Sequence, residues 1–132
     1  MAGVDVRELG AIFAGGVAGG LARSGLAEAL PADAGAWPWA TFVVNLGGAF
    51  LLGWLVTRLQ ERLPQSAYKR PLLGTGVCGA LTTFSTLQLQ LVELAEDGHA
   101  ALAVAYATTS LAGGLAAVFC ATQLARRTRL TA

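Results

Sequence analysis

The residues that could carry chemistry lie in an uncharged stretch, where four hydroxyl side chains surround one phenylalanine in the run TTFST at residues 82–86. Gly74, Gly76 and Gly79 precede this run and weaken helical structure there. An interrupted helix frees backbone carbonyls that can bind a cation, and hydroxyl groups can donate to an anion. The alternative is a continuous helix whose hydroxyls bond to the preceding turn. The density of hydroxyls favours an interruption that binds ions.

Two further polar features lie in other apolar segments. Asn45 is followed by Gly47 and Gly48, and its amide could form a hydrogen bond between helices or line a pore and donate to an anion. Taken by itself, Asn45 favours the first interpretation, a hydrogen bond between helices. Tyr106 and Ser110 fall on one face of a later helix, and that stripe alone favours a packing interface.

The elements that must position these residues are membrane helices. The chain has 132 residues, of which 55% are hydrophobic and 13% charged, whereas about 25% are charged in soluble domains. A bilayer core needs about 20 apolar residues of helix. We therefore expect an all-α membrane protein, with one domain over residues 1–132 and helices near 8–30, 36–60, 69–95 and 99–126. Arg23 interrupts the first segment, close enough to its end to reach the headgroups.

Several function classes are disfavoured by the same sequence. A net charge of +1 implies no nucleic-acid partner. No phosphate-binding loop, zinc signature or nucleophile–base set is present, so an enzyme is not expected. Cys78 and Cys120 lie in apolar runs and favour packing roles. A small multidrug exporter would need a carboxylate inside the first helix, and Glu8 is too near its end.

Charge placement predicts the orientation of the chain. With four spans, the termini and the loop at 58–70 share one side of the membrane. That side holds eight of the nine Lys and Arg residues, namely Arg7, Arg58, Arg62, Lys69, Arg70, Arg126, Arg127 and Arg129. Only Arg23 lies on the other side. Because basic loops stay in the cytoplasm, we expect both termini to be cytoplasmic in a multi-pass protein of the cell membrane.

Four motifs together resemble those of the Fluc/CrcB fluoride channel family, in the family's order and over nearly the whole chain. They are GGVAGGLAR at residues 15–23, TFVVNLG at 41–47, GVCGALTTFST at 76–86, and Tyr106 with Ser110. The run at 76–86 is the most specific of the four. Each of the other motifs is weak when it is taken alone.

The resemblance implies a passive channel that exports fluoride from the cytoplasm and lowers its toxicity. It also implies an antiparallel, dual-topology dimer with two pores and a central structural sodium ion that is not transported. By position, the backbone carbonyls of Gly79 and Thr82 would hold the sodium. The fluoride path would be lined by Asn45, Thr83, Phe84, Ser85, Tyr106 and Ser110, and Arg23 would belong to the structural motif of the first helix.

Two positions depart from the family pattern. The family usually has a second Phe where this chain has Leu87, and often has Glu where this chain has Gln90. An antiparallel homodimer also needs a chain that inserts both ways, whereas eight basic residues against one favour a single orientation. We therefore also consider a subunit that pairs with an oppositely inserted paralogue, which could supply the missing groups, and a non-conducting subunit.

Overall fold

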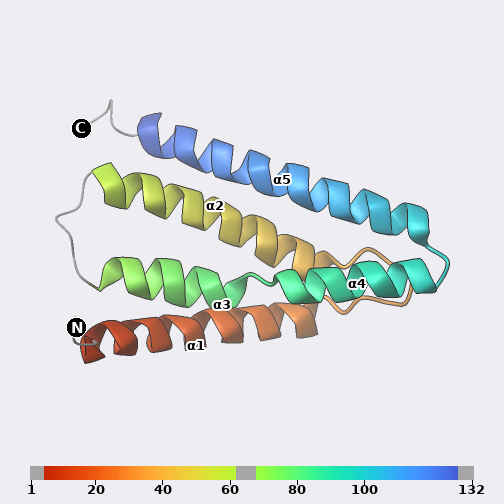
Figure 1. Ribbon diagram of the computed structural model, residues 1–132, viewed down its shortest axis with the longest axis horizontal. Coiled ribbons are helices and arrows are strands. Elements are labelled where there is room, and N and C mark those ends of the chain that lie inside the picture. Colours follow the sequence, from red (N-terminus) through yellow and green to blue (C-terminus); the bar gives the residue numbers. More distant parts are fainter. Residues whose placement is uncertain (1–4, 62–67, 128–132) are drawn as a thin grey trace.

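The protein is built from four long apolar helical spans, which a computed structural model describes over residues 5–61 and 68–127 (Figure 1). Three spans are single helices: α1 Val6–Ala29, α2 Trp39–Glu61 and α5 Ala100–Arg127. The remaining span has three pieces: the π-helix η1 Pro71–Cys78, the short α3 Gly79–Leu81, and α4 Phe84–Glu96. Each span is long and apolar enough to cross a bilayer, which confirms an all-helical chain with four candidate membrane spans.

The helix ends carry ordinary start and stop signals. The carboxylate of Asp5 caps α1 by accepting the backbone N–H of Arg7 at 2.9 Å. Gly98, with φ at +83°, ends α4, and the following His99 N–H donates to the Leu94 carbonyl at 2.8 Å. The His99 ring lies against Gly35, the other glycine with positive φ among the described residues, so the two connections at this end of the molecule touch.

The helices associate in two close pairs, in which α1 lies along η1 and α3, and α2 lies along α5 (Figure 1). Glycines permit the approach of α1, because Gly15 and Gly19 both face the backbone of η1 near Val77. Gly16 and Gly20 have no atom of another element within 4 Å of a Cβ position. The pair Gly15 and Gly19 therefore faces the third span, and the pair Gly16 and Gly20 does not.

A small apolar core lies where α2, α4 and α5 meet. Tyr106 is fully buried there, and its ring packs edge-on against Trp37 with 5.2 Å between the ring centroids. The other buried members of this core are Leu87, Leu94 and Ala103. Many large apolar side chains of the spans are exposed outside this core, where they would face lipid or a second chain.

Charged residues separate along the long axis of the molecule. One end holds the start of α1 and of η1 and the ends of α2 and α5 (Figure 1), and it carries Arg7, Arg58, Lys69, Arg70, Arg126 and Arg127 beside Asp5, Glu8 and Glu61. The opposite end carries Glu28, Asp33, Glu93, Glu96 and Asp97, with Arg23 nearby on α1. Arg62 and Arg129, counted above with the basic side, lie outside the described residues.

Candidate functional site

The third span leaves helical geometry at two residues, Thr82 and Thr83. Their backbone is extended, with φ −82° and ψ 152° at Thr82, and φ −147° and ψ 118° at Thr83. Thr83 caps the helix that follows, because its Oγ1 accepts the backbone N–H of Thr86 at 3.2 Å. The chain therefore resumes as a new helix at Phe84.

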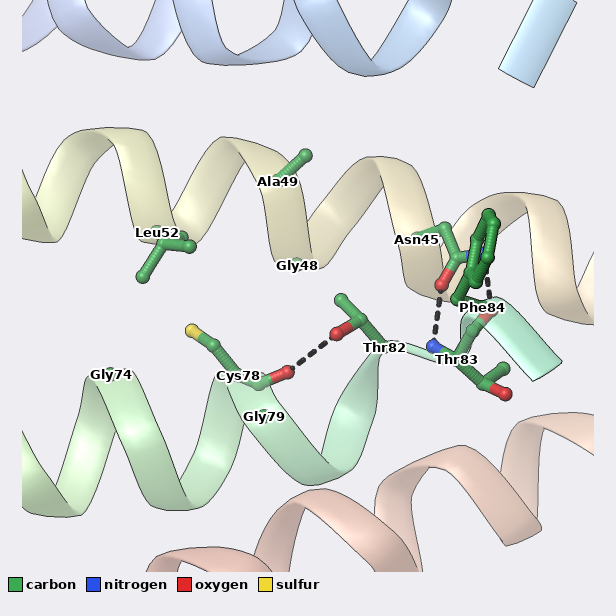
Figure 2. A pocket seen from close by; sticks show the side chains of 10 residues that line it. All are labelled: Asn45, Gly48, Ala49, Leu52, Gly74, Cys78, Gly79, Thr82, Thr83 and Phe84. Carbon is green, nitrogen blue, oxygen red and sulfur yellow. Dashed lines mark hydrogen bonds between the residues drawn. The ribbon is translucent and has the colours of Figure 1, made fainter. Parts of the chain in front are cut away.

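Asn45 of α2 holds the extended segment from the side. Its Oδ1 accepts the backbone N–H of Thr83 at 2.8 Å, and its Nδ2 donates to the Thr83 carbonyl at 3.0 Å (Figure 2). One amide thus pairs with both backbone groups of Thr83, as a neighbouring strand would. These two bonds join neighbouring spans, which is the interpretation that the sequence around Asn45 favours by itself. Because an amide has two N–H donors, Asn45 keeps one N–H for another acceptor.

Hydroxyl groups fix the same two residues along the chain. Thr83 Oγ1 donates to Thr86 Oγ1 at 2.9 Å and lies 3.4 Å from Ser85 Oγ. Thr82 Oγ1 donates to the Cys78 carbonyl at 2.9 Å, and the Thr82 backbone N–H donates to the same oxygen at 3.1 Å. The extended segment is therefore anchored from both flanking helices.

Two carbonyls lose the donors that a continuous α-helix would give them. In such a helix the Gly79 carbonyl accepts the N–H of Thr83, and the Thr82 carbonyl accepts the N–H of Thr86. Here those two N–H groups donate to Asn45 Oδ1 and to Thr83 Oγ1. Backbone oxygens released inside a membrane span are hard donors of the kind that bind sodium. The donor set thus fits the cation that the family resemblance implies.

A cavity of about 380 Å³ opens beside these residues, between α2 and the third span (Figure 2). It is lined by Asn45, Gly48, Ala49, Leu52, Gly74, Cys78, Gly79, Thr82, Thr83 and Phe84. Gly48 has no side chain, and the Thr82 methyl group packs against it. The cavity is open, so the described part of this chain does not enclose an ion path.

The predicted path residues fall into separate groups. Asn45, Thr83 and Phe84 line the open cavity, and Ser85 is exposed next to Phe84. Tyr106 lies in the core, where its hydroxyl donates to Gln90 Oε1 at 3.1 Å. The Ser110 hydroxyl is shielded from solvent and has no partner among the described residues.

Leu87 and Arg23 lie outside the open cavity. Leu87 is buried in the core beside Tyr106, so its side chain points into the helix bundle. Arg23 borders a second cavity of about 230 Å³, which Thr41, Thr83 and Thr86 also line. Thr83 is thus shared by both cavities.

Sequence reasoning included Thr86 in the hydroxyl run but missed its bond to Thr83, and it missed Gly48 as a member of the site. Thr86 is the third residue of α4, and the spacing Thr83-x-x-Thr86 places two hydroxyls where an N-cap and its partner meet. Gly48 lies three residues after Asn45, on the same face of α2. Both signals are readable in the sequence once Thr83 is known to begin a helix.

Comparison with known proteins supplies an independent finding. Residues 10–122 match the family model described as CrcB-like protein, Camphor Resistance (CrcB). The chain is 55% identical over 130 residues to the fluoride-specific ion channel FluC 1 of Mycolicibacterium paratuberculosis, covering 98% of each chain. It is 56% identical over 126 residues to FluC 1 of Mycobacterium bovis, with 96% of each chain covered. It is also 45% identical to FluC of Chlorobaculum tepidum, over 87% of this chain and 91% of that relative.

Proposed function

The chain belongs to the CrcB-like family of fluoride-specific ion channels, and we propose that it lets fluoride leave the cytoplasm passively across the cell membrane. The similarity to FluC 1 proteins over nearly the full length carries this proposal. An inside-negative membrane potential drives an anion outward, so export needs no other energy source. Passive export lowers the intracellular concentration of fluoride and therefore its toxicity.

The proposed fluoride path uses donors without a fixed positive charge. Fluoride is small and strongly hydrated, so a pore must replace its water with directed N–H and O–H groups. The second N–H of Asn45 and the hydroxyl of Ser110 are such donors. The Phe84 ring can present its electropositive edge to the anion. Ser85 adds a further hydroxyl to the proposed path, together with Thr83 and Tyr106, whose hydroxyls donate to Thr86 Oγ1 and Gln90 Oε1 in this structure.

An antiparallel dimer would complete this path. Gly79, Phe84, Ser85 and Gln88 are exposed in the middle of the third span. Polar groups at membrane depth are tolerated where protein or a cavity covers them. A second subunit in the opposite orientation would lay its own TTFST segment across the open cavity and cover these groups.

A structural sodium ion is proposed at the centre of that dimer. The carbonyls of Gly79 and Thr82 are two hard donors, and the same pair in the second subunit would double their number. Bound sodium would supply a positive charge that offsets the carbonyl dipoles and joins the two subunits. Because its ligands belong to the scaffold, the ion is required but not transported.

A second candidate is a channel formed with an oppositely inserted paralogue. The basic end of the described chain favours one orientation, with both termini in the cytoplasm. A paralogous partner could then supply the aromatic and acidic groups that Leu87 and Gln90 lack. Membership of the fluoride channel family removes the multidrug exporter from consideration.

Fluoride efflux from liposomes tests both candidates. The purified chain is reconstituted in vesicles loaded with potassium fluoride or, in a parallel preparation, with potassium chloride. Release after addition of a potassium ionophore is followed with an electrode selective for the loaded anion. Rapid fluoride release without chloride release supports the homodimer and overturns the need for a paralogue. Release only after co-reconstitution with a paralogue supports the second candidate. Absence of release in both preparations overturns the proposed function.

A further inference from the structure

The hydrogen bonds of the extended segment redirect two backbone donors onto side chains. In a continuous helix the N–H of Thr83 and of Thr86 would serve the carbonyls four residues earlier. Asn45 Oδ1 takes the first donor at 2.8 Å, and Thr83 Oγ1 takes the second at 3.2 Å. The carbonyls deprived in this way belong to Gly79 and Thr82.

These two carbonyls are the pair that the family resemblance implies as the ligands of the sodium ion. A carbonyl left without a partner inside a membrane span costs free energy, so it favours any ion or donor that reaches it. Gly79 and Thr82 both line the open cavity, where a ligand can approach them. The side-chain bonds therefore supply a physical reason for a cation at this point of the chain.

We propose that Asn45 and Thr83 are positioning residues for the cation site, because their side chains withhold backbone donors from the Gly79 and Thr82 carbonyls. This inference rests on the proposed structural sodium ion. Asn45 acts across helices from α2, and Thr83 acts within its own span. The second N–H of Asn45 has no hydrogen-bond partner among the described residues, so one amide can prepare the cation site and still donate to fluoride.

The extended segment is also held from moving back into a helix. The Asn45 amide bonds the Thr83 carbonyl as well as its N–H, at 3.0 Å. The Thr83 hydroxyl also donates to Thr86 Oγ1 at 2.9 Å, a second bond that joins the extended segment to the start of α4. Removal of either side chain frees an N–H to return to the carbonyl four residues earlier, which is the carbonyl proposed to bind the cation.

Matched substitutions at Thr83 test this inference. Thr83→Val keeps the shape of the buried side chain but removes its hydroxyl, whereas Thr83→Ser keeps the hydroxyl. The melting temperature of the purified protein in detergent is measured against sodium chloride, with choline chloride holding the ionic strength constant. A ligand that binds the native state raises the melting temperature by mass action. Sodium-dependent stabilisation is a readout that does not depend on fluoride transport.

We expect the sodium concentration at half-maximal stabilisation to rise by about tenfold in Thr83→Val, which corresponds to the loss of one favourable interaction of ordinary strength. Thr83→Ser should restore the wild-type value to within about twofold. Thr86→Val is the control, because it removes a hydroxyl of the same cluster but leaves the Thr83 acceptor in place. An unchanged sodium midpoint in folded Thr83→Val overturns the inference.

Asn45→Leu provides a second variant if Thr83→Val does not fold. It removes the acceptor of the Thr83 N–H from the other helix, and it should raise the sodium midpoint by a similar factor, about tenfold. A wild-type sodium midpoint in Asn45→Leu overturns the role of Asn45. If the wild-type protein shows no sodium-dependent stabilisation, the inference and the sodium site fail together. Fluoride efflux measured in parallel then shows whether the channel function stands without them.

Discussion

Phe84 and Leu87 lie one turn apart on α4 but face different surroundings, since Phe84 is 69% exposed and Leu87 only 9%. Leu87 packs into the core with Tyr106, while Phe84 borders the open cavity. In the described chain Leu87 therefore has a packing position, whereas Phe84 is accessible from the cavity. Substitution of Leu87 should act on the stability of the subunit, and substitution of Phe84 should act on transport.

Leu87→Ala should lower the free energy of unfolding by about 2–3 kcal/mol, because it leaves a cavity in a packed core. Unfolding of the detergent-solubilised protein by sodium dodecyl sulfate, followed by circular dichroism, measures the change. Leu89→Ala is the matched control, since Leu89 is on the same helix and exposed. A similar loss in both variants would contradict the assignment of Leu87 to the core.

Phe84→Leu should reduce fluoride efflux by about tenfold while it changes the stability of the subunit little, because the substitution removes the aromatic ring edge but retains an apolar side chain. The liposome assay with a fluoride electrode measures the effect. Efflux at the wild-type rate would show that the ring does not contact the permeating anion.

Gly48→Ala should displace the extended segment, because the added methyl group would meet the Thr82 side chain. We expect a loss of stability of about 1–3 kcal/mol from overpacking, together with reduced fluoride efflux. Gly47→Ala is the matched control, since no atom lies within 4 Å of a Cβ there. Equal effects of the two substitutions would show that Gly48 has no special contact with Thr82.

Gly19→Ala should separate α1 from the third span, because its Cβ would meet the backbone of Val77, which cannot rotate away as a side chain can. The expected loss is about 1–3 kcal/mol in the same unfolding experiment. Gly20→Ala places its methyl group in open space and should be close to neutral. The prediction fails if Gly20→Ala is the more damaging of the two.

Tyr106→Phe should cost about 1 kcal/mol, because it removes the hydrogen bond to Gln90. Gln90→Leu removes the other partner of the same bond. In a double-mutant cycle, Gln90→Leu should therefore have a smaller effect on Tyr106→Phe than on the wild-type chain. Strict additivity would indicate that this bond contributes nothing to stability.

The four membrane spans were predictable because each residue in a span adds its own free energy of transfer into lipid. Sums over about 20 residues therefore identify all four spans. Asn45 was also partly predictable, because a buried amide in lipid must find a partner. That its partner is the backbone of Thr83 depends on how α2 is rotated and shifted against the third span, which local sequence does not specify.

Other features depended on contacts between helices and were not predicted. Residues 71–78 were expected to form part of an ordinary helix, whereas η1 has π-helical geometry there. The glycine-rich first segment contains two equivalent pairs in its sequence, and only the packing of α1 on η1 distinguishes Gly15 and Gly19 from their neighbours. The inward direction of Leu87 likewise follows from the position of Tyr106 on α5.

The bond between Asn45 and Thr83 also bears on how the chain is made. Thr83 lies 38 residues after Asn45, so the second span leaves the ribosome before the third. The acceptor for the Thr83 N–H is therefore already in the bilayer when that segment arrives, and its extended backbone need not enter lipid unpaired. Biosynthetic order and native geometry are thus matched at this residue, and a reversal of the two spans in the gene would lose that advantage.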